Sequence, residues 1–119
     1  YSVLGHLDII IRYDKNGTYP FEKISDIVNE ILKIVIRDGK GIEVNTSSYR
    51  YGLTDMTPSK DILTLYKKLG GEIITIGSDS HKKGQLGAHI ENTKKVLFDM
   101  EFRYHCTYEN MRPHFHKLI

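Results

Sequence analysis

Short apolar runs alternate along the chain with longer stretches of helical periodicity, and this alternation limits the fold more than any other feature of the sequence. Strands are predicted at residues 2–4, 41–45 and 73–76. The last of these is a continuous apolar run, which is typical of a strand covered on both faces. Strands separated by helices favour βα units, and therefore an α/β fold with a parallel sheet or barrel.

The helices are predicted from apolar residues that recur three and four positions apart, so that each helix buries one stripe. Such stripes cover residues 24–35, 57–69 and about 87–100. We expect Gly39 and Gly41 to end the first helix, since glycine tolerates the positive φ of a helix C-terminus.

Two further boundaries are predicted from single residues. Thr57 is expected to be the N-cap of the second helix, with Pro58 at its first position. The tail is expected to begin as a strand at residues 102–104 and to end in polar turns with a short helical piece.

Composition narrows the classes of function. The formal net charge is only +2 and no Lys/Arg cluster stands out, so a nucleic-acid partner is not indicated. No apolar run could span a bilayer, and there is no signal-peptide pattern. Cys106 is the single cysteine, which excludes an intramolecular disulfide and a structural zinc site of cysteine ligands. We therefore expect a cytoplasmic protein with no membrane partner.

Polar side chains follow each predicted strand at its carboxyl end. In parallel α/β folds the chemistry gathers at these ends, so we expect these residues to share one site. They form three pairs, one pair for each strand: His6 with Asp8, Asn45 with Arg50, and Asp79 with His81.

Asp79 and His81 have the spacing of metal ligands. Residues at i and i+2 of an extended segment point to the same side, and carboxylate oxygen with imidazole nitrogen suits Zn, Mn or Fe. The alternative is a surface turn in which Asp79 caps the following helix. His6 and Asp8 repeat the spacing, and their alternative is a hydrogen-bonded turn.

Arg12 and Arg50 are the candidates for binding an anion, because the guanidinium fork matches a phosphate in two parallel hydrogen bonds. The alternative is that both are solvated surface arginines. His105, His114 and His116 crowd the tail, where surface or partly buried structural roles are favoured over a metal site.

Three motifs together carry a resemblance to a known family. They occupy residues 5–13 (Gly-His-Leu-Asp-Ile-Ile-Ile-Arg-Tyr), 42–50 (Ile-Glu-Val-Asn-Thr-Ser-Ser-Tyr-Arg) and 75–81 (Thr-Ile-Gly-Ser-Asp-Ser-His). In this order they resemble the polymerase-and-histidinol-phosphatase (PHP) superfamily, in particular its histidinol-phosphatase branch. The resemblance implies the C-terminal portion of a distorted (β/α)7 TIM-like barrel, with parallel strands alternating with helices.

The resemblance also implies roles for individual residues. His6, Asp79 and His81 would bind metal, with Asp79 and His81 also counted as catalytic, in a site of three divalent ions (Zn, Mn or Fe). Arg12 and Arg50 would bind the substrate phosphate. Asp8 and Asn45 would support the site without being direct ligands.

The implied activity is metal-dependent hydrolysis of a small-molecule phosphate ester, L-histidinol phosphate, to L-histidinol and phosphate in histidine biosynthesis. A hydroxide activated by the metals would attack phosphorus. Two alternatives stay open. One is a phosphoesterase of the same kind acting on another phosphate or a nucleic acid, and the other is a non-catalytic metal-binding or assembly fragment.

The chain departs from the family pattern in one respect, since the family's first metal motif, His-x-His, is missing. We therefore expect residues 1–119 to be the C-terminal part of a PHP-type domain whose N-terminal part is absent. This fragment would be inactive alone, and the missing half or another chain would be needed to complete the barrel.

Overall fold

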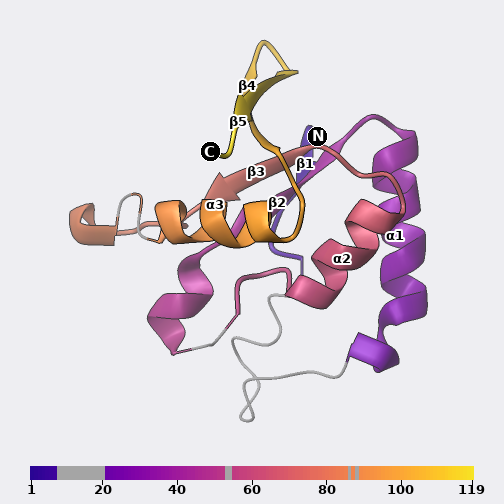
Figure 1. Ribbon diagram of the computed structural model, residues 1–119, viewed down its shortest axis with the longest axis horizontal. Coiled ribbons are helices and arrows are strands. Elements are labelled where there is room, and N and C mark those ends of the chain that lie inside the picture. Colours follow the sequence, from indigo (N-terminus) through magenta and orange to yellow (C-terminus); the bar gives the residue numbers. More distant parts are fainter. Residues whose placement is uncertain (8–20, 53–54, 86, 88) are drawn as a thin grey trace.

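The computed structural model describes residues 1–7, 21–52, 55–85, 87 and 89–119, with only the backbone described at residues 50 and 51. A three-stranded parallel sheet runs through it in the order β1 (Val3–Leu4), β2 (Gly41–Asn45) and β3 (Ile74–Gly77) (Figure 1). Ile42 pairs with Leu4 on one side and with Ile74 on the other, which places β2 in the centre. The predicted α/β class with parallel strands is confirmed.

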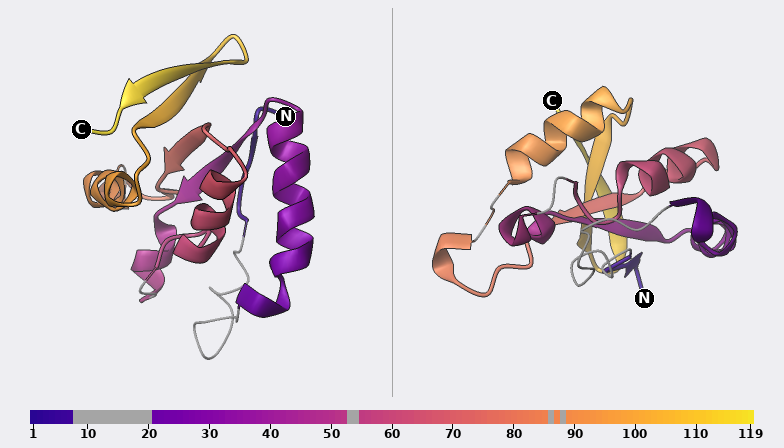
Figure 2. Two further views of the ribbon diagram at one scale, coloured as in Figure 1. Left: turned by 45° about the vertical axis from the view of Figure 1, so that its right-hand side comes forward. Right: turned by 90° about the horizontal axis from the view of Figure 1, so that it is seen from below.

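Three α-helices follow the three strands in the order that the periodicity predicted. They are α1 (Ser25–Arg37), α2 (Lys60–Lys68) and α3 (Ile90–Asp99). Figure 2 shows α1 and α3 on opposite sides of the parallel sheet. Short 3-10 helices, named η2 (Phe21–Lys23), η3 (Ser47–Tyr51) and η4 (Lys83–Gln85), lie in the connections.

The end of α1 was predicted correctly at Gly39 and wrongly at Gly41. Gly39 has a φ of 68°, the left-handed conformation that glycine adopts without strain. Gly41 instead begins β2, where a Cβ atom would overlap the side chain of Ile73 on the approach to β3. Its small size is needed for close strand packing and not for a helix cap.

The start of α2 was also predicted wrongly. Thr57 pairs with Asn45 in an antiparallel bridge, with backbone N–H···O distances of 2.7 and 3.1 Å, so it cannot cap the helix. The helix begins at Lys60, whose N–H donates to Asp55 Oδ2 at 3.1 Å. Asp55 thus supplies the acceptor that the sequence assigned to Thr57.

The tail differs most from the prediction, because it is an antiparallel hairpin with no helical piece. Strands β4 (Tyr104–Glu109) and β5 (Arg112–Lys117) pair along their whole length and form a sheet of their own. Asn110 and Met111 turn the chain with φ values of 50° and 62°, as a two-residue hairpin loop requires. The predicted strand at residues 102–104 therefore reaches the hairpin only at its last residue.

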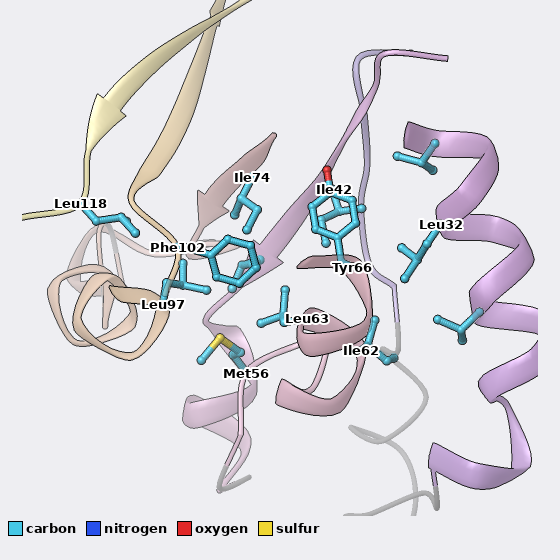
Figure 3. Packing of buried hydrophobic residues seen from close by; sticks show 13 residues of the cluster. Leu32, Ile42, Met56, Ile62, Leu63, Tyr66, Ile74, Leu97, Phe102 and Leu118 are labelled. Carbon is cyan, nitrogen blue, oxygen red and sulfur yellow. The ribbon is translucent and has the colours of Figure 1, made fainter. Parts of the chain in front are cut away.

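One hydrophobic core joins the three α-helices to the parallel sheet and includes Phe102 and Leu118, which flank the hairpin (Figure 3). Tyr66 is completely buried in it and donates a hydrogen bond to the Ile73 carbonyl at 2.9 Å. Burial raises the pKa of Tyr66 to about 12. The largest fully buried apolar side chains come from all three α-helices, from β2 and β3 and from the segment before α2: Leu32, Ile42, Met56, Ile62, Leu63, Ile74 and Leu97.

The hairpin is attached to this core through a few apolar side chains. Leu118 is buried, and the Tyr108 hydroxyl donates to the Ser2 carbonyl at 3.2 Å. Cys106 is a buried free thiol whose pKa is raised by burial. Across the described ranges, no helix is both long enough and apolar enough to cross a bilayer.

Candidate metal and phosphate site

The carboxyl ends of β1, β2 and β3 meet at one edge of the sheet, which we call the strand-end edge. Asn45, the last residue of β2, is in register with Gly77, the last residue of β3. The next amide, Thr46 N–H, donates to the Gly77 carbonyl at 2.8 Å, so the two chains stay together beyond the strands. His6 follows β1 and Asp79 follows β3 at this edge, as the strand order requires.

His6 and Asp79 share an uncommon backbone conformation. Their φ values are 53° and 49°, in the left-handed region that costs a non-glycine residue about 1–3 kcal/mol. The same region is used by Asn110 and Met111, where it serves only to turn the hairpin. The conformation therefore shows that the chain turns sharply at both strand ends, and it places a ligand-type side chain at each turn.

The His81 imidazole is held by its own loop. Its Nδ1 lies 2.9 Å from the Asp79 carbonyl oxygen, and its backbone N–H donates to Gln85 Oε1 at 3.1 Å. A carbonyl oxygen can only accept, so Nδ1 carries the proton in the neutral ring and Nε2 carries the lone pair. This tautomer, fixed by a backbone carbonyl, is the arrangement typical of metal-binding histidines.

Asn45 is almost completely buried and is fixed through both ends of its side chain. Its Oδ1 accepts the Ser47 N–H at 2.9 Å, and its Nδ2 donates to Glu43 Oε1 at 3.2 Å. Its backbone is fixed too, through the bridge to Thr57. A side chain so constrained can hold another group in place.

Sequence reasoning did not assign a role to Glu43, although it lies inside one of the motifs. Ile42 and Val44 are fully buried in the core, so Glu43 and Asn45 point to the opposite face of the strand. The Glu43 carboxylate lies 2.9 Å from the position of a Cβ atom on Gly77 and 3.6 Å from one on Gly5. The alternation of apolar and polar residues along β2 predicts only that Glu43 lies on the face opposite the core, and it does not show that its carboxylate lies among the strand ends.

Of the three remaining predicted site residues, the structure describes only the backbone of Arg50. Asp8 and Arg12 lie outside the described residues. Arg50 is in η3, directly after β2, so its backbone lies near the strand-end edge. Three polar residues that lead into η3, Thr46, Ser47 and Ser48, are buried.

The donor atoms at the strand-end edge determine whether a divalent metal could bind there. Imidazole nitrogen from His6 and His81 and carboxylate oxygen from Asp79 are the donors that Zn, Mn and Fe accept, so the residue types fit. In the part of the chain that the structure describes, no three His, Cys, Asp or Glu side chains are close enough to hold an ion by themselves. The described residues thus supply suitable donors at neighbouring strand ends without forming a closed cage.

The sequence was compared with those of known proteins. No family model matches the chain. It is 32% identical over 105 residues to the probable histidinol-phosphatase of Thermotoga maritima, and the match covers 87% of this chain and 43% of the relative. The histidinol-phosphatase of Lactococcus lactis is 31% identical over 114 residues, covering 94% and 42% of the two chains.

A third relative, the probable histidinol-phosphatase of Clostridium acetobutylicum, is 34% identical over 98 residues, which cover 78% of this chain and 37% of the relative. The parallel sheet and the helices that alternate with its strands define an α/β protein. The relatives show more particularly that the chain is homologous to histidinol-phosphatases. It spans less than half the length of these curated relatives.

Proposed function

We propose that the protein containing this chain hydrolyses L-histidinol phosphate to L-histidinol and phosphate, as a step of histidine biosynthesis in the cytoplasm. The observation that carries the proposal is the homology to proteins named histidinol-phosphatase, which reaches 94% of this chain. The strand-end edge supports it independently, because a phosphatase of this class needs metal and anion ligands at one place.

We further propose that residues 1–119 form the C-terminal part of a PHP-type (β/α)7 barrel. The support is the parallel order of β1, β2 and β3 and the alternation of these strands with α1, α2 and α3. Further strands, from an N-terminal part or another chain, would complete the barrel. The match to about two fifths of the length of two relatives agrees with this division.

The metal site in this proposal contains His6, Asp79 and His81, and the complete site would hold three ions of Zn, Mn or Fe. Bound metal would lower the pKa of a water molecule and so supply hydroxide as a nucleophile at neutral pH. The contact of His81 Nδ1 with the Asp79 carbonyl favours the tautomer that leaves Nε2 free of a proton. Asn45 and Asp8 would hold neighbouring groups in place without being direct ligands.

Arg12 and Arg50 would bind the phosphate group of the substrate. A guanidinium at each position would hold the phosphoryl oxygens and offset their negative charge as phosphorus is attacked. The near-neutral charge of the chain favours a small phosphate ester over a nucleic acid.

Replacement of Arg50 tests the assignment of phosphate binding. We expect Arg50→Ala to raise the KM for histidinol phosphate by about 10-fold or more with a smaller change in kcat, because a charged hydrogen bond of about 1.5–3 kcal/mol is lost. Phosphate release is measured in the native-length protein loaded with Mn²⁺ or Zn²⁺. Arg37→Ala is the control, since Arg37 is exposed and pairs with Asp38 at the end of α1.

The same assay, run over a panel of phosphate esters, tests the substrate itself. Histidinol phosphate is expected to have the highest kcat/KM. A preference for another phosphomonoester or for a nucleic-acid phosphodiester would contradict the proposed substrate while leaving a metal-dependent phosphoesterase. An unchanged KM in Arg50→Ala would contradict the role of Arg50 alone.

A further inference from the structure

Glu43 lies at the centre of the parallel sheet, and the reaction proposed above gives it no role. It is the central residue of β2, the middle strand of the parallel sheet, and its side chain lies on the face opposite the core. This face carries Asn45, which is fixed by Ser47 and donates to Glu43 Oε1 at 3.2 Å. The carboxylate is half-buried and is therefore held at a defined place on the sheet.

The two glycines at the neighbouring strand ends show where the carboxylate lies. A Cβ atom on Gly77 would be 2.9 Å from Glu43 Oε2, closer than ordinary van der Waals contact. A Cβ atom on Gly5 would be 3.6 Å from Oε1. The carboxylate thus occupies the space between the ends of β1 and β3.

The expected metal ligands begin at these same glycines. His6 directly follows Gly5, and Asp79 is two residues beyond Gly77. Consecutive Cα atoms are about 3.8 Å apart, so His6 lies one such step from Gly5 and Asp79 two steps from Gly77, the glycines that the Glu43 carboxylate approaches. A negative charge beside these two glycines acts on a cation held at the neighbouring strand ends, because electrostatic interactions extend over a Debye length of about 10 Å.

We propose that Glu43 is a positioning residue for the metal site, whose charged carboxylate between the ends of β1 and β3 raises the affinity of the strand-end edge for divalent cations. Asn45 orients the carboxylate, since its amide bridges Glu43 to the backbone of η3. Partners that orient and charge a metal site in this way commonly contribute 10–100-fold in affinity. The inference rests on the proposed metal site at this edge, and it assigns to Glu43 no contact with substrate.

The test measures binding of Mn²⁺ alone, by calorimetry and by electron paramagnetic resonance of the bound ion, in native-length protein stripped of metal. Glu43→Gln keeps the shape of the side chain and removes its charge. We expect its dissociation constant for Mn²⁺ to rise at least about 10-fold. The spectrum of the bound ion is also expected to change, which general destabilisation would not cause.

Glu72→Gln is the matched control because it makes the same change of net charge. Glu72 is exposed and precedes β3, whereas Gly77 ends that strand, so the two ends lie about 16 Å apart along it. At this distance the charge is screened by salt, and we expect Mn²⁺ affinity within about twofold of the unmodified protein. Equal affinities in Glu43→Gln and Glu72→Gln would overturn the inference.

Two further outcomes separate this inference from the proposed function. If the unmodified protein binds Mn²⁺ but releases no phosphate from histidinol phosphate, the substrate is wrong and the titration alone decides the role of Glu43. If it binds neither Mn²⁺ nor Zn²⁺, both proposals are wrong. Should Glu43→Gln fail to fold, Glu43→Asp decides: it keeps the charge and is expected to bind Mn²⁺ as the unmodified protein does, and loss of binding would overturn the inference.

Discussion

The strand-end edge and the C-terminal hairpin both carry histidines, yet the side chains of these histidines are engaged differently. In the hairpin, His116 Nε2 lies 2.7 Å from the Thr107 hydroxyl, and the His105 and His116 rings pack with centroids 5.3 Å apart. At the edge, His81 Nδ1 lies 2.9 Å from the carbonyl oxygen of Asp79 in its own loop. Histidine content alone is therefore a poor guide to a metal site.

The topology explains why the two regions differ. The hairpin forms a separate antiparallel sheet in which β4 and β5 pair with each other along their whole length. The edge gathers the ends of three parallel strands, and each strand must pass its chain into a loop there. The second arrangement brings loops from distant parts of the sequence, with their ligand-type residues, to one edge of the sheet.

The largest effect that separates the two regions is expected from Asp79. Asp79→Asn keeps a residue that tolerates a φ of 49° and removes the carboxylate charge. We expect metal-dependent phosphate release to fall by more than about 100-fold, beyond the loss seen when an indirect partner of a metal is removed. The assay is kcat/KM for histidinol phosphate in the native-length protein.

His114→Gln in the hairpin is the matched control for Asp79→Asn. His114 is exposed and lies 3.8 Å from Glu109, so its loss should leave kcat/KM within about twofold, as for surface substitutions generally. A comparable loss in both variants would show that the hairpin belongs to the site and would remove the distinction between the regions.

An intermediate effect, on stability and not on chemistry, is expected from Leu118. This side chain is buried where β5 ends, and it attaches the hairpin to the core. Leu118→Ala should lower the free energy of unfolding by about 2–3 kcal/mol through lost burial and the cavity left behind. Urea denaturation measures it, and kcat below the transition is expected to be unchanged.

An unchanged free energy of unfolding in Leu118→Ala would contradict this role of Leu118, because the hairpin would then contribute nothing to the stability of the fold. Ile119→Ala is the control because Ile119 is exposed beside it. Its stability is expected to stay within about 0.5 kcal/mol of the unmodified protein.

The smallest effect is a pH dependence that arises in the hairpin. The pKa of His105 is lowered from its ordinary value of 6.5, first by burial and then by the nearby charges of Lys94 and His116, while Glu91 opposes the shift. The unfolded chain then binds the proton more readily than the folded one. Stability from this residue is present above pH 6.5 and is lost as pH falls from 6.5 through the lower pKa of the folded state.

His105→Gln should therefore reduce the fall in melting temperature between pH 7.5 and pH 5.5. Scanning calorimetry at the two pH values measures the difference. A fall as large in His105→Gln as in the unmodified protein would show that other groups cause the acid sensitivity.

Sequence patterns were most informative where side chains repeat with a clear period. The stripe that includes Val28, Leu32 and Val35 predicted α1, and the apolar run before Gly77 predicted β3, because burial of one face or both dictates such patterns. The gathering of strand ends followed from the order of these elements. Topology was thus predictable before any contact was known.

Local patterns failed where a tertiary contact decides the structure. Thr57 and Pro58 have the composition of a helix start, but the bridge from Thr57 to Asn45 delays α2 until Lys60. The hairpin was missed because its strands carry few β-branched residues and its turn uses Asn110 and Met111, and no Asn-Gly pair announces the loop.

The candidate site shows the same limit of local sequence patterns. Asp79 and His81 stand out because both are ligand types at a strand end, whereas Glu43 lies within a strand and looks like an ordinary solvent-facing position. Only the closeness of its carboxylate to Gly5 and Gly77 shows that it lies among the strand ends. This closeness joins residues about 35 positions apart, which no local pattern can show.

The most direct test of the difference between the two regions is the location of bound metal. Crystals of the native-length protein grown with Mn²⁺ or Zn²⁺ would be measured at the absorption edge of the metal. We predict anomalous peaks at the strand-end edge, within about 2.0–2.2 Å of an Asp79 oxygen and of His81 Nε2. A peak between His105 and His116, with none at the strand-end edge, would contradict the account.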